Sequence, residues 1–169
     1  RWIDTDGQQR MRPDALEAQL ATDRAAGHVP FIVVGTAGNV STGAVDPLGT
    51  LADICTQHGL WFHVDGAYGA PAASLPGAPA DLRALVRADS VALDPHKWLY
   101  SPIEAGCTLV RDPEVLAATF DFQPPYYRLT DDEPEPGLNY YALGMQNTRG
   151  FRALKVWLGL RHVGRAGYV

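Results

Sequence analysis

The chain places a lysine directly after a short apolar run. Lys97 ends the motif Asp94-Pro95-His96-Lys97, which follows the run Ser90–Leu93. An ammonium group costs free energy where water is excluded, so a lysine at the end of a buried strand is usually paired or chemically used. A desolvated amine can attack a carbonyl carbon. We therefore single out Lys97 as a candidate nucleophile, against the simpler interpretation of a surface lysine after a strand.

A carboxylate ends a second apolar run. Asp65 closes the segment Trp61–Asp65 and precedes the small residues Gly66 and Ala67. The simpler interpretation is an acid that caps the turn before Gly66. An amine and an acid at two strand ends also suggest a site for pyridoxal phosphate, whose aldehyde bonds to a lysine and whose ring nitrogen pairs with an acid. Small residues beside Asp65 leave room for a flat ring.

Composition excludes several classes of function. The chain has 169 residues, 46% hydrophobic and 20% charged, with a net charge of -5, which indicates one globular domain with a real core. It has no long basic stretch, so we expect no nucleic-acid partner. No apolar run is long enough to cross a bilayer, so we expect no membrane association. Cys55 and Cys107 form no disulfide framework, which favours the reducing cytoplasm.

Two other patterns carry less weight. Residues 35–43 follow a strand and are rich in glycine, but Ala44 stands where a phosphate-binding loop needs lysine, so a plain loop is the better interpretation. His63 and Asp65 alternate onto the same side of a strand. They have no recognised ligand spacing, and we expect no metal site.

Apolar runs alternate with helical patterns along most of the chain. Strands are expected at 31–34, 60–64, 90–93 and 107–110, and helices at 13–26, 47–58, 81–88, 113–119 and 148–163. Asp46 is expected to cap the helix that starts at Pro47. This order predicts an α/β fold, with a mostly parallel sheet and helices on both faces. Ligands bind at the carboxyl ends of such strands, which is where Asp65 and Lys97 fall.

The segment from Gln123 to Gly137 has a different character. It holds four prolines and several acids, with few side chains to bury. We expect it to be mobile, or ordered only by neighbouring chains.

Four segments together resemble the group II amino-acid decarboxylases, which depend on pyridoxal phosphate and include aromatic-L-amino-acid, histidine, tyrosine and glutamate decarboxylases. These segments are residues 37–47, 63–69, 94–99 and 151–157, in the family's order and with fitting spacings. The resemblance implies a large domain of the aspartate-aminotransferase type (fold type I) over residues 1–169. It also implies that this domain is incomplete, with an upstream segment and a small C-terminal domain outside the chain.

The resemblance assigns roles by position. Lys97 would form the Schiff base, Asp65 would pair with the pyridinium, and Ala67 would pack on one face of the ring. His96 and Asp94 would lie near the phosphate and the Schiff base. An aspartate at position 94 is a poor neighbour for phosphate unless it is protonated or bridged by water.

A tyrosine in a later loop completes the implied site. Phe120, Pro124 and Tyr126 fit the family pattern of a mobile loop whose tyrosine protonates the substrate carbon after CO2 leaves. Related aldehyde synthases tend to carry Phe there, so Tyr126 favours simple decarboxylation. The adjacent Tyr127 leaves the register open by one residue.

The sequence therefore predicts decarboxylation of an L-amino acid, with an aromatic amino acid favoured, to the amine and CO2 in a homodimer with a shared active site. The alternatives are an aldehyde synthase, a lyase acting on a C–S bond, and a catalytically silent fragment that needs partner chains. On its own the stretch of 169 residues is expected to be a poor enzyme. The substrate's identity stays open, because the family's pocket draws on the upstream segment and on the partner subunit.

Overall fold

The computed structural model describes residues 1–122 and 139–168. The chain divides into two compact units, one formed by Arg1–Leu109 with Arg152–Val169 and the other by Val110–Phe151. Tyr126 and the whole proline-rich segment 123–137 lie outside the described residues, so the expectation about that segment stays a prediction. The expected extent of the incomplete large domain also stays a prediction.

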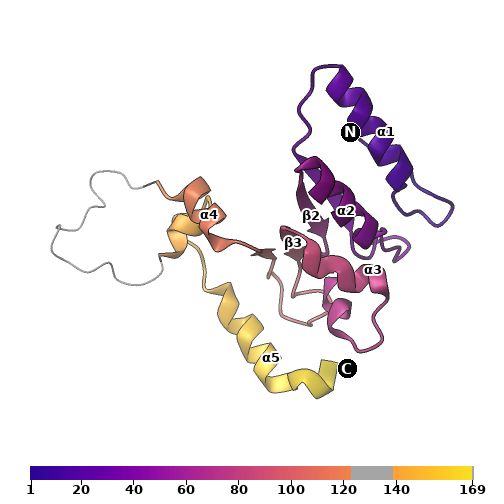
Figure 1. The fold of residues 1–169 in the computed structure, drawn as a ribbon. Coiled ribbons are helices and arrows are strands. Elements are labelled where there is room, and N and C mark those ends of the chain that lie inside the picture. Colours follow the sequence, from indigo (N-terminus) through magenta and orange to yellow (C-terminus); the bar gives the residue numbers. More distant parts are fainter. Residues whose placement is uncertain (123–138, 169) are drawn as a thin grey trace. The chain divides into compact units, whose positions relative to one another are not determined.

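A four-stranded sheet with the order β1-β2-β3-β4 organises the fold. Figure 1 shows two of its strands, β2 and β3, beside the helices α2 (Leu48–His58) and α3 (Ala80–Arg83). The strands are β1 (Ile32–Thr36), β2 (Trp61–Asp65), β3 (Ser90–Leu93) and β4 (Cys107–Val110). β2 pairs in parallel with both β1 and β3. Thr36 lies opposite Asp65, and Asp65 lies opposite Ala92. The predicted α/β class with a mostly parallel sheet is confirmed.

The helices follow the predicted order. They are α1 (Pro13–Ala25), α2 (Leu48–His58), α3 (Ala80–Arg83), α4 (Pro113–Phe120) and α5 (Arg152–Tyr168), with 3₁₀ turns at Ala70–Ser74, Ala84–Arg87 and Tyr140–Leu143. The helix expected over 81–88 is α-helical only to Arg83 and continues as a 3₁₀ turn. α5 starts later than expected and changes direction at Gly164, where φ is 66°.

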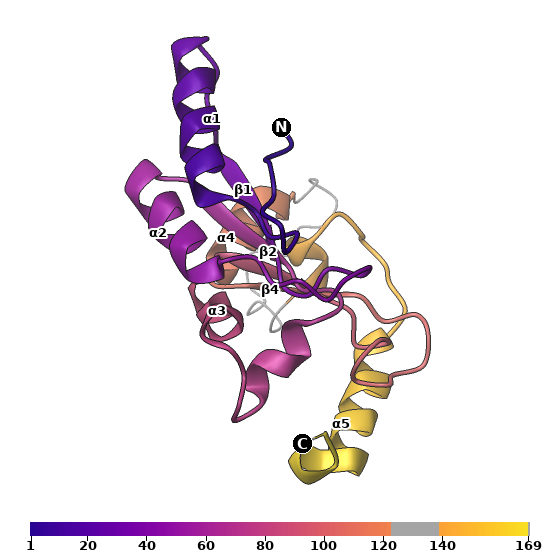
Figure 2. The same ribbon diagram turned by 90° about the vertical axis from the view of Figure 1, so that its right-hand side faces the viewer.

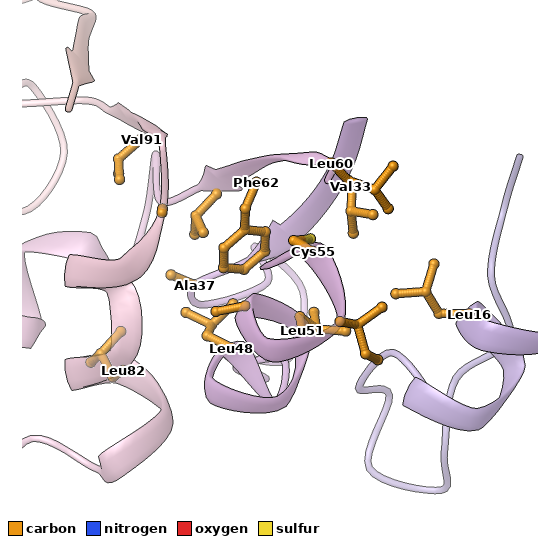
Figure 3. Packing of buried hydrophobic residues seen from close by; sticks show 14 of the residues in the cluster. Leu16, Val33, Ala37, Leu48, Leu51, Cys55, Leu60, Phe62, Leu82 and Val91 are labelled. Carbon is orange, nitrogen blue, oxygen red and sulfur yellow. The ribbon is translucent and has the colours of Figure 1, made fainter. Parts of the chain in front are cut away.

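Helices α1, α2 and α3 lie on one side of β1 and β2 (Figure 2). Alternate strand residues face them, and Phe62 of β2 is only 1% exposed among the leucines of α2 (Figure 3). Leu48 and Leu51 are fully buried in the same cluster. Gly35 of β1 makes room for them, since a Cβ there would lie 3.0 Å from Cδ2 of Leu48. Each such large side chain contributes about 1.5–3 kcal/mol on burial.

The second face of the sheet carries polar contacts. Nε1 of Trp61 donates to Oγ of Ser90 (2.8 Å), and Nδ1 of His63 lies 2.7 Å from the same oxygen. Ile32 and Val34 remain exposed on this face among the described residues. In the described part of the chain, a layer of helices covers one face of the sheet. The second layer of helices that the sequence predicts does not cover Ile32 and Val34 on the other face.

Asp46 does not cap α2, and that prediction is wrong. Pro47 occupies the cap position, and α2 begins at Leu48. The Asp46 carboxylate instead accepts the backbone N–H groups of Met11 (2.7 Å) and Thr36 (2.8 Å). It is 7% exposed, and these two bonds satisfy a carboxylate that has little access to water. They fasten the N-terminal segment to the end of β1.

The loops after β1 and β2 approach each other so closely that glycine is required. The N–H of Gly69 donates to the carbonyl of Ala37 (3.0 Å), and a Cβ on Gly69 would lie 2.4 Å from that oxygen. Gly38 faces Gly69 across this contact and has a φ of +88°, a conformation that favours glycine. The contact fixes the two loops at the carboxyl ends of β1 and β2.

We predict that Gly69→Ala destabilises the protein by about 1–3 kcal/mol, because the new methyl group must displace backbone. Gly77→Ala is the matched control, since a Cβ on Gly77 would have nothing within 4 Å. This control should change the free energy of unfolding by less than about 1 kcal/mol. Urea unfolding of both variants measures the difference, and equal midpoints would show that the two loops are not in close contact.

Candidate active site

The carboxyl ends of β1, β2 and β3 meet at one edge of the sheet. Backbone pairing continues one residue past the strands, where Ala37 N–H donates to Asp65 O (2.8 Å) and Gly66 N–H donates to Ala92 O (3.0 Å). The Asp65 side chain and the turn that follows β3 are therefore held at the same edge. Ligands bind at this edge in open α/β sheets.

Lys97 lies in a turn that begins three residues before it, at Asp94. The turn is closed by Lys97 N–H donating to Asp94 O (2.9 Å) and by Ser101 N–H donating to Pro95 O (3.1 Å). The Nζ atom of Lys97 lies 2.8 Å from Oδ2 of Asp94. Both side chains are partly exposed, Lys97 at 37% and Asp94 at 25%, so the amine is paired and still accessible.

His96 contacts the same carboxylate. Its Nε2 lies 3.8 Å from Oδ2 of Asp94. Its other ring nitrogen, Nδ1, lies 2.8 Å from the carbonyl oxygen and 3.0 Å from the backbone nitrogen of Ala105, a buried residue. The backbone of Ala105 thus fixes the ring with Nε2 facing Asp94.

Asp65 keeps one carboxylate oxygen available. Oδ1 accepts the N–H of Ala67 (3.1 Å), which is the turn contact of the simpler interpretation. In the part of the chain that the structure describes, this is the only hydrogen bond to the Asp65 side chain. Asp65 is exposed and Ala67 is partly exposed, so a second partner for the carboxylate can approach from the sheet edge.

An aromatic contact joins the Asp65 loop to the Lys97 turn. Tyr68 and Trp98 pack edge to face, with ring centroids 5.3 Å apart and an interplanar angle of 74°. Such pairs contribute about 0.5–1.5 kcal/mol beyond their burial. We did not predict this contact from the sequence; the signal that could have found it is the aromatic residue close behind each candidate, three after Asp65 and one after Lys97.

The structure gathers the predicted residues into two groups. Asp94, His96 and Lys97 are in mutual contact through Asp94, and Asp65 is hydrogen-bonded to Ala67. Among the described residues no hydrogen bond or ion pair links the two groups directly, and the Tyr68–Trp98 pair is the contact that bridges their loops. Tyr126 lies outside the described residues.

The two cysteine thiols are poorly suited to act as nucleophiles, and the described residues form no metal site. Burial raises the pKa of the Cys55 thiol to about 11, with a further contribution from the charge of Asp89, and burial also raises the pKa of Cys107. Thiols with raised pKa values form little reactive thiolate. In residues 1–122 and 139–168, no group of three His, Cys, Asp or Glu side chains is placed to hold a metal ion.

The donor set fits an aldehyde cofactor with a basic ring nitrogen. An accessible primary amine and a carboxylate with an available oxygen emerge from adjacent strands, with the small side chain of Ala67 beside the acid. An amine bonds to an aldehyde, and a carboxylate stabilises a protonated ring nitrogen.

No helix in the described residues is long and apolar enough to cross a membrane.

Comparison with known proteins places the chain among such enzymes. Residues 1–169 match the family model described as the pyridoxal-dependent decarboxylase conserved domain. The chain is 42% identical over 166 residues to an aromatic-L-amino-acid decarboxylase of Bacillus atrophaeus, covering 98% of this chain and 35% of that protein. It is 36% identical over 161 residues to the tryptophan decarboxylase TDC1 of Camptotheca acuminata, covering 95% of this chain and 32% of that protein.

Solved structures agree with the sequence relatives. The crystal structure of Oryza sativa TDC with PLP and tryptamine superposes with a TM-score of 0.88 at 32% identity, over 99% of this chain and 35% of that one. Mouse CSAD gives a TM-score of 0.87 at 36% identity, over 99% and 34%. The chain thus spans about a third of the length of the relatives it matches. The match over all its residues shows that the chain belongs to the pyridoxal-dependent decarboxylase family.

Proposed function

We propose that the full-length protein is a pyridoxal-phosphate-dependent decarboxylase that converts an aromatic L-amino acid to its amine and CO2. The observation that carries the proposal is the placement of Lys97 and Asp65 at one edge of one parallel sheet, in a chain of this family. The relatives named for aromatic amino acids support the substrate class. A mouse relative named acidic amino acid decarboxylase GADL1, 34% identical, makes acidic amino acids the second class to test.

Each candidate residue of this chain would have a separate role at the cofactor. Lys97 would hold it covalently through Nζ, and Asp65 would face its ring nitrogen, with Ala67 against the ring. The cofactor, when bound, supplies an electron-accepting ring that stabilises the charge left on the substrate carbon after CO2 departs. The Asp65 carboxylate would keep a proton on the ring nitrogen, and this fixed charge is the electrostatic part of the catalysis. His96, held by Ala105, would support the Lys97 turn.

Tyr126 is the proposed proton donor to the substrate carbon. Its support is the sequence pattern formed with Phe120 and Pro124, since the residue lies outside the described part of the chain. A homodimer with a shared active site and a cytoplasmic location complete the proposal. The dimer is supported by the family resemblance, and the location by the two free cysteines.

An aldehyde synthase is the second candidate function. A phenylacetaldehyde synthase of a Rosa hybrid cultivar is 33% identical to this chain over 156 residues. Such an enzyme consumes oxygen and releases aldehyde, ammonia and peroxide along with CO2. Tyr126 favours decarboxylation alone, because the aldehyde synthases that resemble this family tend to carry Phe there.

The proposal predicts equal amounts of CO2 and amine, without peroxide, when the full-length protein and pyridoxal phosphate are given L-tryptophan, L-tyrosine or L-DOPA. Glutamate and cysteine sulfinate should react much more slowly. Lys97→Ala should lower kcat by a factor of about 10³ or more, because the covalent attachment is lost. Tyr126→Phe should shift products toward aldehyde and peroxide.

Lys155→Ala is the matched control, because Lys97 and Lys155 are the two lysines of the chain. It should keep wild-type turnover. Peroxide from the wild-type protein would identify an aldehyde synthase, and sulfide release would identify a C–S lyase. Full activity of Lys97→Ala would overturn the assignment of the lysine.

A further inference from the structure

We propose that Asp94 is a positioning residue that holds the free amine of Lys97, and that it is not a neighbour of the cofactor phosphate. The proposal rests on the proposed function, because it takes Lys97 as the lysine that bonds to the cofactor. It replaces the role that the sequence resemblance implies for Asp94 with one drawn from its contacts.

The backbone turn brings the two charges together. Asp94 and Lys97 are three residues apart, and the Lys97 N–H donates to the Asp94 carbonyl (2.9 Å). Their side chains leave the turn on the same side, and Nζ reaches Oδ2 at 2.8 Å. A lysine side chain has many rotamers, so this contact gives its amine a defined resting place at the sheet edge.

The surroundings of the carboxylate suit a cation better than an anion. Oδ2 faces both Nζ of Lys97 and Nε2 of His96, the latter at 3.8 Å. Gly106 lies on the side of the other oxygen, where a Cβ would come within 3.5 Å of Oδ1. A phosphate placed here would meet a carboxylate of the same charge sign, which is unfavourable at contact distance.

Breaking the ion pair adds a small amount to the activation free energy for the reaction of Lys97 with the cofactor. To bond to the aldehyde carbon, Nζ must leave Asp94 and lose a proton, and water departs as the C=N bond forms. When a substrate amine displaces the lysine, Nζ can form the ion pair with Asp94 again. Partly exposed ion pairs stabilise by only about 0.2–1 kcal/mol, so the cost corresponds to a rate factor of about 1.5 to 5.

The test compares two aldehydes that differ only in the phosphate group. Full-length wild-type and Asp94→Asn proteins are mixed with pyridoxal phosphate or with pyridoxal, and borohydride stops the reaction by reducing the C=N bond at timed intervals. Mass spectrometry of the Lys97 peptide gives the rate of labelling. We expect Asp94→Asn to speed labelling by a factor of about 1.5 to 5 with both aldehydes, and by the same factor for each, because the change acts on the amine.

Controls separate this inference from other effects. Asp53→Asn removes a carboxylate that pairs with Arg87 (2.7 Å) and should leave both rates unchanged. Asp94→Glu restores a carboxylate and should return both rates toward wild type. Labelling of the Lys155 peptide gives the reactivity of a lysine outside the site.

Two results would overturn the role of Asp94. A rate change confined to pyridoxal phosphate would place Asp94 at the phosphate, and equal or slower labelling with both aldehydes would show that the ion pair does not restrain the lysine. If the wild-type protein is not labelled at Lys97, the proposed function fails instead, whatever Asp94→Asn does.

Discussion

Parallel pairing of β1, β2 and β3 in one register is the constraint on which the candidate site depends. It aligns Thr36, Asp65 and Ala92 across the sheet, so that the loops carrying chemistry leave from one edge. A shift by one residue would turn Asp65 to the helical face, where Phe62 and Val64 are buried. The hydrophobic contacts of α2 with that face hold the register, and the core therefore determines where the carboxylate points.

Two carboxylates close to the same edge have different surroundings, and this difference separates their proposed roles. One oxygen of Asp65 accepts a hydrogen bond from the backbone of its own turn, and the other oxygen is available for a partner outside the described residues. Asp94 directs an oxygen at Lys97 and His96, both potential cations. The first arrangement suits a charge that acts on a bound ring. The second suits a charge that governs the position of an amine.

The sequence was sufficient for the elements and insufficient for their contacts. Short apolar runs separated by helical patterns identified the four strands, because strands that are buried in a sheet need apolar residues in the sequence itself. Local chemistry failed at Asp46, because its carboxylate binds Met11 and Thr36 rather than the adjacent helix. The Tyr68–Trp98 pair could not be read in advance, because a contact between loops from different strands depends on register and loop path. The pairing of Asp94 with Lys97 lies within one turn and depends on the path of the backbone there, which brings the two side chains together.

In the proposed site, Lys97 and Asp65 meet on one cofactor molecule. This arrangement can be tested with pyridoxal phosphate that carries ¹⁵N in the ring and is reduced onto Lys97 by borohydride, in the wild-type protein and in Asp65→Asn. The ¹⁵N chemical shift is recorded above the pH at which the free ring loses its proton. We predict a protonated ring nitrogen in the wild type and an unprotonated one in the variant. The same protonation state in both would show that Asp65 does not face the ring held by Lys97.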